Sequence, residues 1–126
     1  MNASVDQQAF ARLAAAFGNA ELWTVGPPSF AATRADLTRK TPQVYATLAA
    51  VFGGNRVIDW QRLTGDILTP EQGRAKDGVH FAAAGAAVAG KRLAAAWLQA
   101  RTGVTASAMP ALPGFSWPLT LGALGA

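Results

Sequence analysis

The sequence predicts an α/β fold, as part of a three-layer α/β/α domain with a short parallel sheet. Helical and strand-like patterns alternate along its 126 residues in the order helix, strand, helix, strand, helix, which is typical of right-handed crossovers onto a parallel sheet. The hydrophobic fraction of 51% is sufficient for one packed core. Two strands leave the edges of such a sheet without neighbours, so we expect residues 1–102 to form only a portion of a domain.

The N-terminal part is expected to hold the first helix and the first strand. Apolar residues at helical spacing predict a helix over residues 5–17, which Gly18 ends. The apolar run at residues 22–25 predicts a short buried strand, and the Gly-Pro-Pro sequence at residues 26–28 stops it. The polar residues 29–40 are predicted to be irregular apart from a helical turn.

The central part is expected to hold the second helix and the second strand. Thr41 is predicted to be the N-cap of this helix, with Pro42 at the first helical position and Gly53 just past its end. "RVIDW" at residues 56–60 predicts the second strand, and residues 61–76 are predicted to form a loop.

The C-terminal part is expected to hold a long helix and an apolar tail. Alanine-rich residues 83–101 predict the helix, with Lys91 and Arg92 on its solvated face. Residues 103–126 carry no charge and contain three prolines, and they are too apolar for a typical disordered linker. We expect this tail to pack as an extended arm or to bind a partner.

Composition excludes several classes of function. The net charge of +4 comes from basic residues that are dispersed and not interleaved with aromatic rings, so nucleic acid is not an expected partner. One histidine and no cysteine argue against a metal site, and no cofactor is expected. No run of eighteen apolar residues is present, so a membrane span is not expected, and the N-terminus lacks the pattern of a signal peptide.

The sole histidine follows an aspartate by three residues in the sequence D-G-V-H. A turn at Gly78 can return the Asp77 carboxylate to the ring of His80, fix its tautomer and leave Nε2 free to accept a proton. The alternative is a surface histidine beside an aspartate at a helix entry. Asp59 is another carboxylate near a strand end, which we expect to bond loop backbone or Arg62.

The stretch "DGVHFAAAGAAVAGKRLAAAW" resembles the final block of SGNH/GDSL hydrolases, in which D-G-x-H and a later glycine open the last helix. "RVIDW" and "ELWTVGPPSF" are similar to the last two strands of that family, so the resemblance covers residues 5–99. It implies a flavodoxin-like SGNH fold and ester hydrolysis through a serine nucleophile, a histidine base and an orienting aspartate. In this chain His80 would be the base and Asp77 its orienting carboxylate.

The family's nucleophile block, Gly-Asp-Ser, has no counterpart in this chain. The four serines, Ser4, Ser29, Ser107 and Ser116, all lack that neighbourhood. The resemblance implies Asn2 as an oxyanion-hole residue, with an ordinary terminus as the alternative. It also implies Pro28 and Ser29 in the substrate pocket, where the alternative is a simple strand stop. Ala82 stands where the family often has a helix-capping Ser or Thr.

Two functions follow as expectations. The first is an ester hydrolase acting on a small-molecule ester of acyl, lipid or carbohydrate type, present here as an incomplete chain that is inactive alone; hydrolysis and acyl transfer are not separated. The second is a non-catalytic interaction module, which self-associates or binds a partner chain through the open sheet and residues 104–126.

Overall fold

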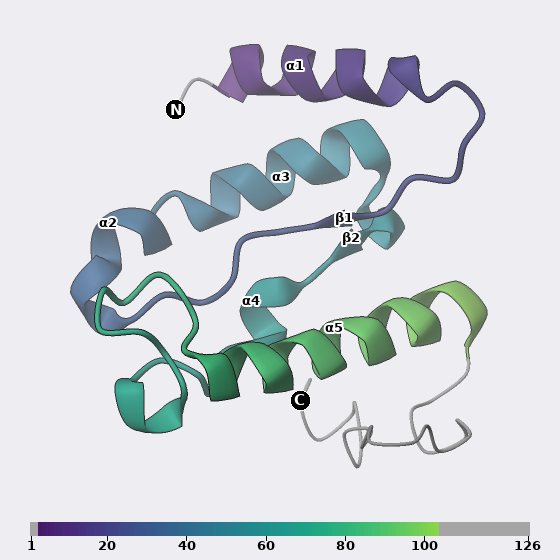
Figure 1. The fold of residues 1–126 in the computed structure, drawn as a ribbon. Coiled ribbons are helices and arrows are strands. Elements are labelled where there is room, and N and C mark those ends of the chain that lie inside the picture. Colours follow the sequence, from purple (N-terminus) through teal and green to yellow (C-terminus); the bar gives the residue numbers. More distant parts are fainter. Residues whose placement is uncertain (1–2, 104–126) are drawn as a thin grey trace.

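The computed structural model describes residues 3–103, so Asn2 and the tail residues 104–126 lie outside the described residues (Figure 1). Ten helices and strands follow one another in this part of the chain. They are the α-helices α1 (Ala3–Ala16), α2 (Ala35–Thr38), α3 (Thr41–Phe52), α4 (Trp60–Leu63) and α5 (Ala83–Thr102), the 3-10 helices η1 (Ala32–Arg34), η2 (Gly54–Arg56) and η3 (Pro70–Gln72), and the strands β1 (Thr24–Val25) and β2 (Val57–Ile58).

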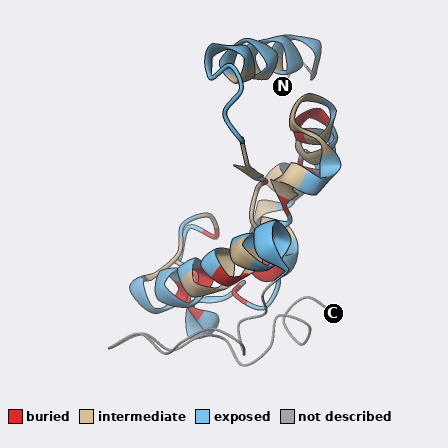
Figure 2. Cartoon of the chain, turned by 90° about the vertical axis from the view of Figure 1, so that its right-hand side faces the viewer, coloured by how far each residue is buried: buried red, intermediate tan, exposed pale blue. Residues whose placement is uncertain are grey.

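The two strands form a parallel sheet joined by a helical crossover. Thr24 pairs with Val57 and Val25 with Ile58, and α3 lies in the connection. Helices α1 and α3 lie on one side of the sheet, and α5 lies on the other (Figures 1 and 2). The described chain is therefore a helix-rich α/β structure with a small parallel sheet. Each strand is shorter than the sequence predicted, two residues in place of four or five.

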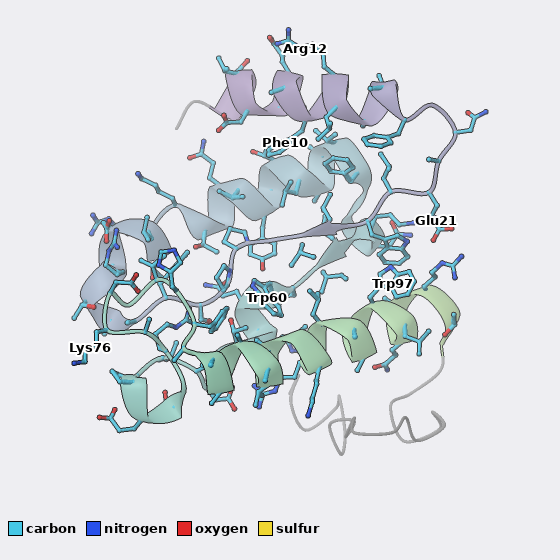
Figure 3. The ribbon with its side chains drawn as sticks, viewed as in Figure 1. Phe10, Arg12, Glu21, Trp60, Lys76 and Trp97 are labelled. Carbon is cyan, nitrogen blue, oxygen red and sulfur yellow. The ribbon has the colours of Figure 1, made fainter. Side chains whose placement is uncertain are left out.

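The buried core is small and is divided between the two sides of the sheet, with Leu48 on α3. Leu48, Ile58, Leu63 and Ile67 are its large buried hydrophobic residues, and the small residues on α5 let that helix approach closely. Helix α1 is largely exposed (Figure 2). Phe10 is directed from α1 toward α3 (Figure 3), where its ring packs edge-on against Phe52. Three other apolar residues of the N-terminal region remain more than half exposed: Val5, Leu13 and Phe17.

Glu21 joins three segments at the amino end of the sheet. Its carboxylate accepts a hydrogen bond from Nε1 of Trp23 at 2.6 Å and lies 3.4 Å from the guanidinium of Arg56 and 3.1 Å from that of Arg101. The guanidinium of Arg56 also lies over the Trp23 ring, and that of Arg101 over the ring of Trp97. The last turn of α5 is thus fixed beside the start of β1 (Figure 3).

Two predictions about helix α3 and helix α5 are wrong. Lys40, not Thr41, is the N-cap of α3, because Thr41 is itself helical and its buried hydroxyl donates to the carbonyl of Leu37. Arg92 does not belong to a solvated face: only 12% of its side chain is exposed. It donates to the Leu63 carbonyl and forms a two-bond ion pair with Asp66, which fixes α5 to the loop after α4.

The two segments predicted to be irregular contain further helical turns. Residues 29–40 include η1 and α2, and residues 61–76 include part of α4 and all of η3. Asp59 bonds loop backbone as predicted: its Oδ1 accepts from the backbone N–H of Arg62 at 3.1 Å and caps α4. Over residues 3–103, no helix is both long enough and apolar enough to cross a membrane.

Candidate functional site

The D-G-V-H sequence forms the tip of a narrow hairpin that directly precedes α5. Arg74 and Phe81 make an antiparallel bridge, and the backbone N–H of Ala75 donates to the carbonyl of His80 at 2.8 Å. Gly78 turns the chain with a φ of 74°, a conformation that costs glycine little and other residues more. This hairpin positions Asp77 and His80.

Both oxygens of the Asp77 carboxylate are bonded within the hairpin. Oδ1 accepts from the backbone N–H groups of Val79 and His80, each at 2.9 Å. Oδ2 lies 2.5 Å from Nδ1 of His80, so the predicted contact between the two side chains is present. The hydrogen bond with His80, followed by the two backbone N–H groups, holds the pKa of Asp77 well below its usual range.

The ring of His80 is open to solvent on its other side. Its side chain is 79% exposed, and Nε2 has no hydrogen-bond partner among residues 3–103. Because Nδ1 faces an ionised carboxylate, the neutral ring carries its proton on Nδ1 and leaves Nε2 as the acceptor. The pair can therefore accept a proton from a group brought to its exposed face.

The hairpin lies at the end of the sheet toward which β1 runs. The chain leaves β1 in the direction of α2, and the hairpin lies beside this region (Figure 1). The backbone N–H of Ala31 donates to the Gly78 carbonyl at 3.1 Å, which fixes the tip against η1. The pair is therefore on the carboxyl side of the parallel strands, where parallel α/β sheets commonly bind ligands.

Ser29, a predicted pocket residue, uses its polar groups in contacts inside the fold. Its hydroxyl donates to the carbonyl of Gln61 at 2.7 Å, and its backbone N–H donates to Oγ1 of Thr64 at 2.9 Å. The other serine of the described chain is Ser4, and no hydrogen bond joins either hydroxyl to His80. Neither hydroxyl is therefore positioned to give a proton to His80 in this structure.

The rest of the segment after β1 is fixed by Tyr45. Its hydroxyl donates to the Pro27 carbonyl at 2.8 Å and accepts from the backbone N–H of Gln61 at 2.9 Å. Burial raises the pKa of Tyr45 to about 12, so the hydroxyl keeps its proton for the bond to Pro27. Pro28 lies in this held segment, and its role in a substrate pocket stays a prediction, as does that of Asn2, which is outside the described residues.

Arg74, a buried side chain directly beneath the hairpin, is a site residue that was not predicted from the sequence. It is 1% exposed and donates to three backbone carbonyls, and its guanidinium lies 4.1 Å from the centroid of the Phe81 ring. The sequence around Arg74 carries no local signal for its burial, because two of its three carbonyl partners, Ile67 and Ser29, lie outside the hairpin.

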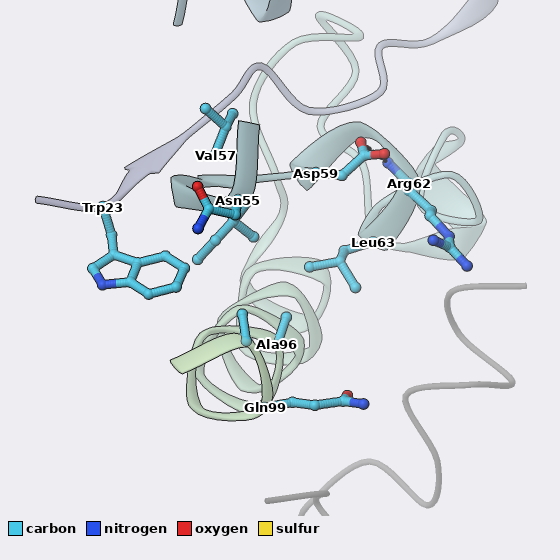
Figure 4. A pocket seen from close by; sticks show the side chains of 10 residues that line it. Trp23, Asn55, Val57, Asp59, Arg62, Leu63, Ala96 and Gln99 are labelled. Carbon is cyan, nitrogen blue, oxygen red and sulfur yellow. Dashed lines mark hydrogen bonds between the residues drawn. The ribbon is translucent and has the colours of Figure 1, made fainter. Parts of the chain in front are cut away.

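An open pocket of about 500 Å³ lies between β2 and α5, away from Asp77 and His80 (Figure 4). Trp23 and Asn55 line one end of it, and Asp59 and Arg62 line the other. Neither Asp77 nor His80 is among its lining residues. Within residues 3–103, no group of three or more His, Asp or Glu side chains could hold a metal ion.

Comparisons of the chain with protein-family models, with curated proteins and with solved structures found no match.

Proposed function

We propose that this chain is the base-bearing, C-terminal portion of an SGNH/GDSL-type ester hydrolase with a flavodoxin-like fold. The observation that supports this most is the bond between Asp77 Oδ2 and Nδ1 of His80, made in a turn on the carboxyl side of the sheet and directly before α5. The resemblance of the D-G-V-H sequence and the helix after it to the last block of that family adds the reaction class.

In this reaction His80 and Asp77 act on a serine hydroxyl supplied from outside residues 3–103. Nε2 of His80 takes the hydroxyl proton while the oxygen attacks the ester carbonyl carbon. The imidazolium then gives this proton to the departing alkoxide, and water removes the acyl group from the serine by the same route. Asp77 stays ionised and stabilises the imidazolium. The substrate class is a small-molecule ester of acyl, lipid or carbohydrate type.

Complementation tests this proposal. The purified chain is mixed with the N-terminal half of a complete SGNH/GDSL hydrolase that ends before its last two strands, and p-nitrophenyl acetate cleavage is measured. We expect turnover only from the mixture, because the nucleophile and the base are on different chains. His80→Ala should abolish it, and Asp77→Asn should lower kcat by about 10⁴-fold, as expected when the orienting carboxylate is lost.

Ser29→Ala is the matched control for the nucleophile. Because its hydroxyl donates to Gln61, its removal should leave turnover of the mixture unchanged. Activity of the isolated chain that disappears in Ser29→Ala would show that the nucleophile is internal and that the proposal is wrong. No turnover from a mixture in which light scattering shows that the two chains associate would also contradict it.

A groove beside β1 favours a second candidate function, a non-catalytic interaction module. This open groove of about 520 Å³ is bordered by α1, β1 and α3, and its lining is mainly apolar: Phe10, Leu13, Val25, Val44, Leu48 and Phe52. Within the described chain β1 pairs only with β2, and Oγ1 of Thr24 is buried without a hydrogen-bond partner. An open strand edge of this kind can pair with another chain, and a second copy is the simplest occupant.

Val25→Lys tests self-association through this groove. Val25 is 43% exposed, so a lysine can be accommodated, but its charge would oppose burial in an apolar interface. We expect light scattering to give a mass above 13.0 kDa for the wild-type chain and the monomer mass for Val25→Lys. Val88→Lys, at a residue of α5 that is 42% exposed, should leave the mass unchanged. A monomeric wild-type chain would exclude this association.

A further inference from the structure

We propose that Arg74 is a positioning residue. It holds the His80 ring in its orientation through a hydrogen bond to the peptide unit between Val79 and His80. The catalytic meaning of this inference rests on the proposed function, whereas the effect of Arg74 on the His80 ring can be measured without any ester substrate.

The guanidinium of Arg74 joins three separate segments of the chain. Nε donates to the Ile67 carbonyl at 2.7 Å, Nη1 to the Val79 carbonyl at 2.9 Å, and Nη2 to the Ser29 carbonyl at 2.5 Å. These carbonyls belong to the loop after α4, to the hairpin and to the segment after β1. The planar fork of an arginine can reach three acceptors in fixed directions, which a lysine ammonium on a flexible stem does not reproduce.

The position of Arg74 is costly for a charged group. Its side chain is among the most buried of the described residues, and no carboxylate among residues 3–103 forms an ion pair with it. A buried charge requires compensating hydrogen bonds, here the three carbonyls, together with the face of the Phe81 ring. An apolar side chain of similar length would fill this space without the cost of burying a charge. Packing alone therefore does not account for an arginine at this position, and the role of its three hydrogen bonds has to be explained.

The bonds of Arg74 meet those of Asp77 on one peptide unit. The peptide group between Val79 and His80 has its carbonyl on Nη1 of Arg74 and its N–H on Oδ1 of Asp77. With both ends held, this peptide plane cannot rotate freely, and the direction in which the His80 side chain leaves the backbone is fixed. The other oxygen of the same Asp77 carboxylate then receives Nδ1 of the ring. Arg74 is therefore coupled to the ring through one peptide plane and one carboxylate.

The single histidine makes this coupling measurable by NMR. Because the chain contains one histidine, the ring ¹⁵N signals belong to His80 without further assignment. We expect the wild-type ring, once neutral, to hold the Nδ1–H tautomer. Arg74→Lys keeps the charge but loses the fork, and Arg74→Met keeps only the length; in both we expect this preference to be lost and the Nε2–H tautomer to appear.

Arg92→Met is the matched control. Arg92 is also a largely buried arginine that bonds a backbone carbonyl, but its partners, Leu63 at the end of α4 and Asp66 after it, lie outside the hairpin. It should lower stability without changing the His80 tautomer. An Arg74→Lys protein that is folded by circular dichroism and keeps the Nδ1–H tautomer would overturn the inference, because Arg74 would then serve stability alone.

Phe81→Leu provides the test should both Arg74 variants fail to fold. It removes the ring against which the guanidinium is held, so the bond from Nη1 to the Val79 carbonyl is weakened and we expect the ratio of the two tautomers to change by about tenfold. An unchanged ratio would overturn the inference. A wild-type ring that prefers the Nε2–H tautomer would instead contradict the Asp77–His80 pair, and with it the proposed function.

Discussion

Gly85→Ala is expected to lower the free energy of unfolding by about 3 kcal/mol, at the upper end of the usual cost of overpacking. Gly85 is buried in the first turn of α5, where the backbone of the helix touches that of Gly73. A Cβ at Gly85 would overlap the Gly73 carbonyl oxygen and lie 2.7 Å from its carbonyl carbon. Backbone atoms cannot move aside as a flexible side chain can, so the start of α5 has to shift. Urea denaturation followed by circular dichroism measures the loss.

Gly90→Ala on the same helix is the control, with the opposite expected sign. A Cβ at Gly90 meets nothing within 4 Å, and the residue is exposed. Alanine is favoured over glycine in a helix by about 1 kcal/mol, so this variant should be more stable than the wild type. Equal effects of the two substitutions would mean that α5 does not approach Gly73 as closely as described.

The long helices could be predicted from sequence because their end signals are local. Helix α3 was predicted to start at Pro42, with Thr41 as its N-cap, and to end before Gly53; it spans Thr41–Phe52 and so starts one residue earlier. Helix α5 was predicted over residues 83–101 and spans Ala83–Thr102, with Gly103 in the left-handed conformation past its end. Proline in a first turn and glycine past a last turn act on the backbone next to them, whatever the rest of the chain does.

Strand length could not be predicted in the same way, because a strand ends where its partner ends. The apolar patterns marked residues 22–25 and 56–60, but only Thr24–Val25 and Val57–Ile58 pair. Those partners are more than thirty residues apart, and the extent of a strand depends on its packing context more than on its own sequence. A local pattern gives the place of a strand and not its extent.

The same distinction explains which site residues could be found. Asp77 and His80 are three residues apart with a glycine between them, so the turn that joins them is a local event. Arg74 and Arg92 were missed or misplaced because their partners are distant: Ser29 is 45 residues from Arg74, and Asp66 is 26 residues from Arg92. The residues next to a basic side chain in the sequence do not show whether a distant carbonyl or carboxylate will bond it and bury it.

Gly78→Ala is expected to lower the free energy of unfolding by about 2 to 3 kcal/mol and to separate Asp77 from His80. Two costs add at this position. The φ of 74° costs a residue with a Cβ about 1 to 2 kcal/mol. The new Cβ would also lie 3.0 Å from Cβ of Ala31 and 3.0 Å from Oγ1 of Thr33, so the tip of the hairpin is pressed away from η1.

Gly18→Ala separates these two costs. Gly18 has a φ of 59°, but a Cβ there meets nothing within 4 Å, so only the backbone cost applies. We expect Gly18→Ala to lower the free energy of unfolding by about 1 kcal/mol and to keep the Nδ1–H tautomer of His80. Gly78→Ala should lower the free energy of unfolding further and also remove the preference for that tautomer. Chemical denaturation and the ¹⁵N signals of the ring measure both quantities. If Gly78→Ala kept the tautomer, the Asp77–His80 bond would not depend on the contact between the hairpin and η1, because the pair would then form within the turn alone.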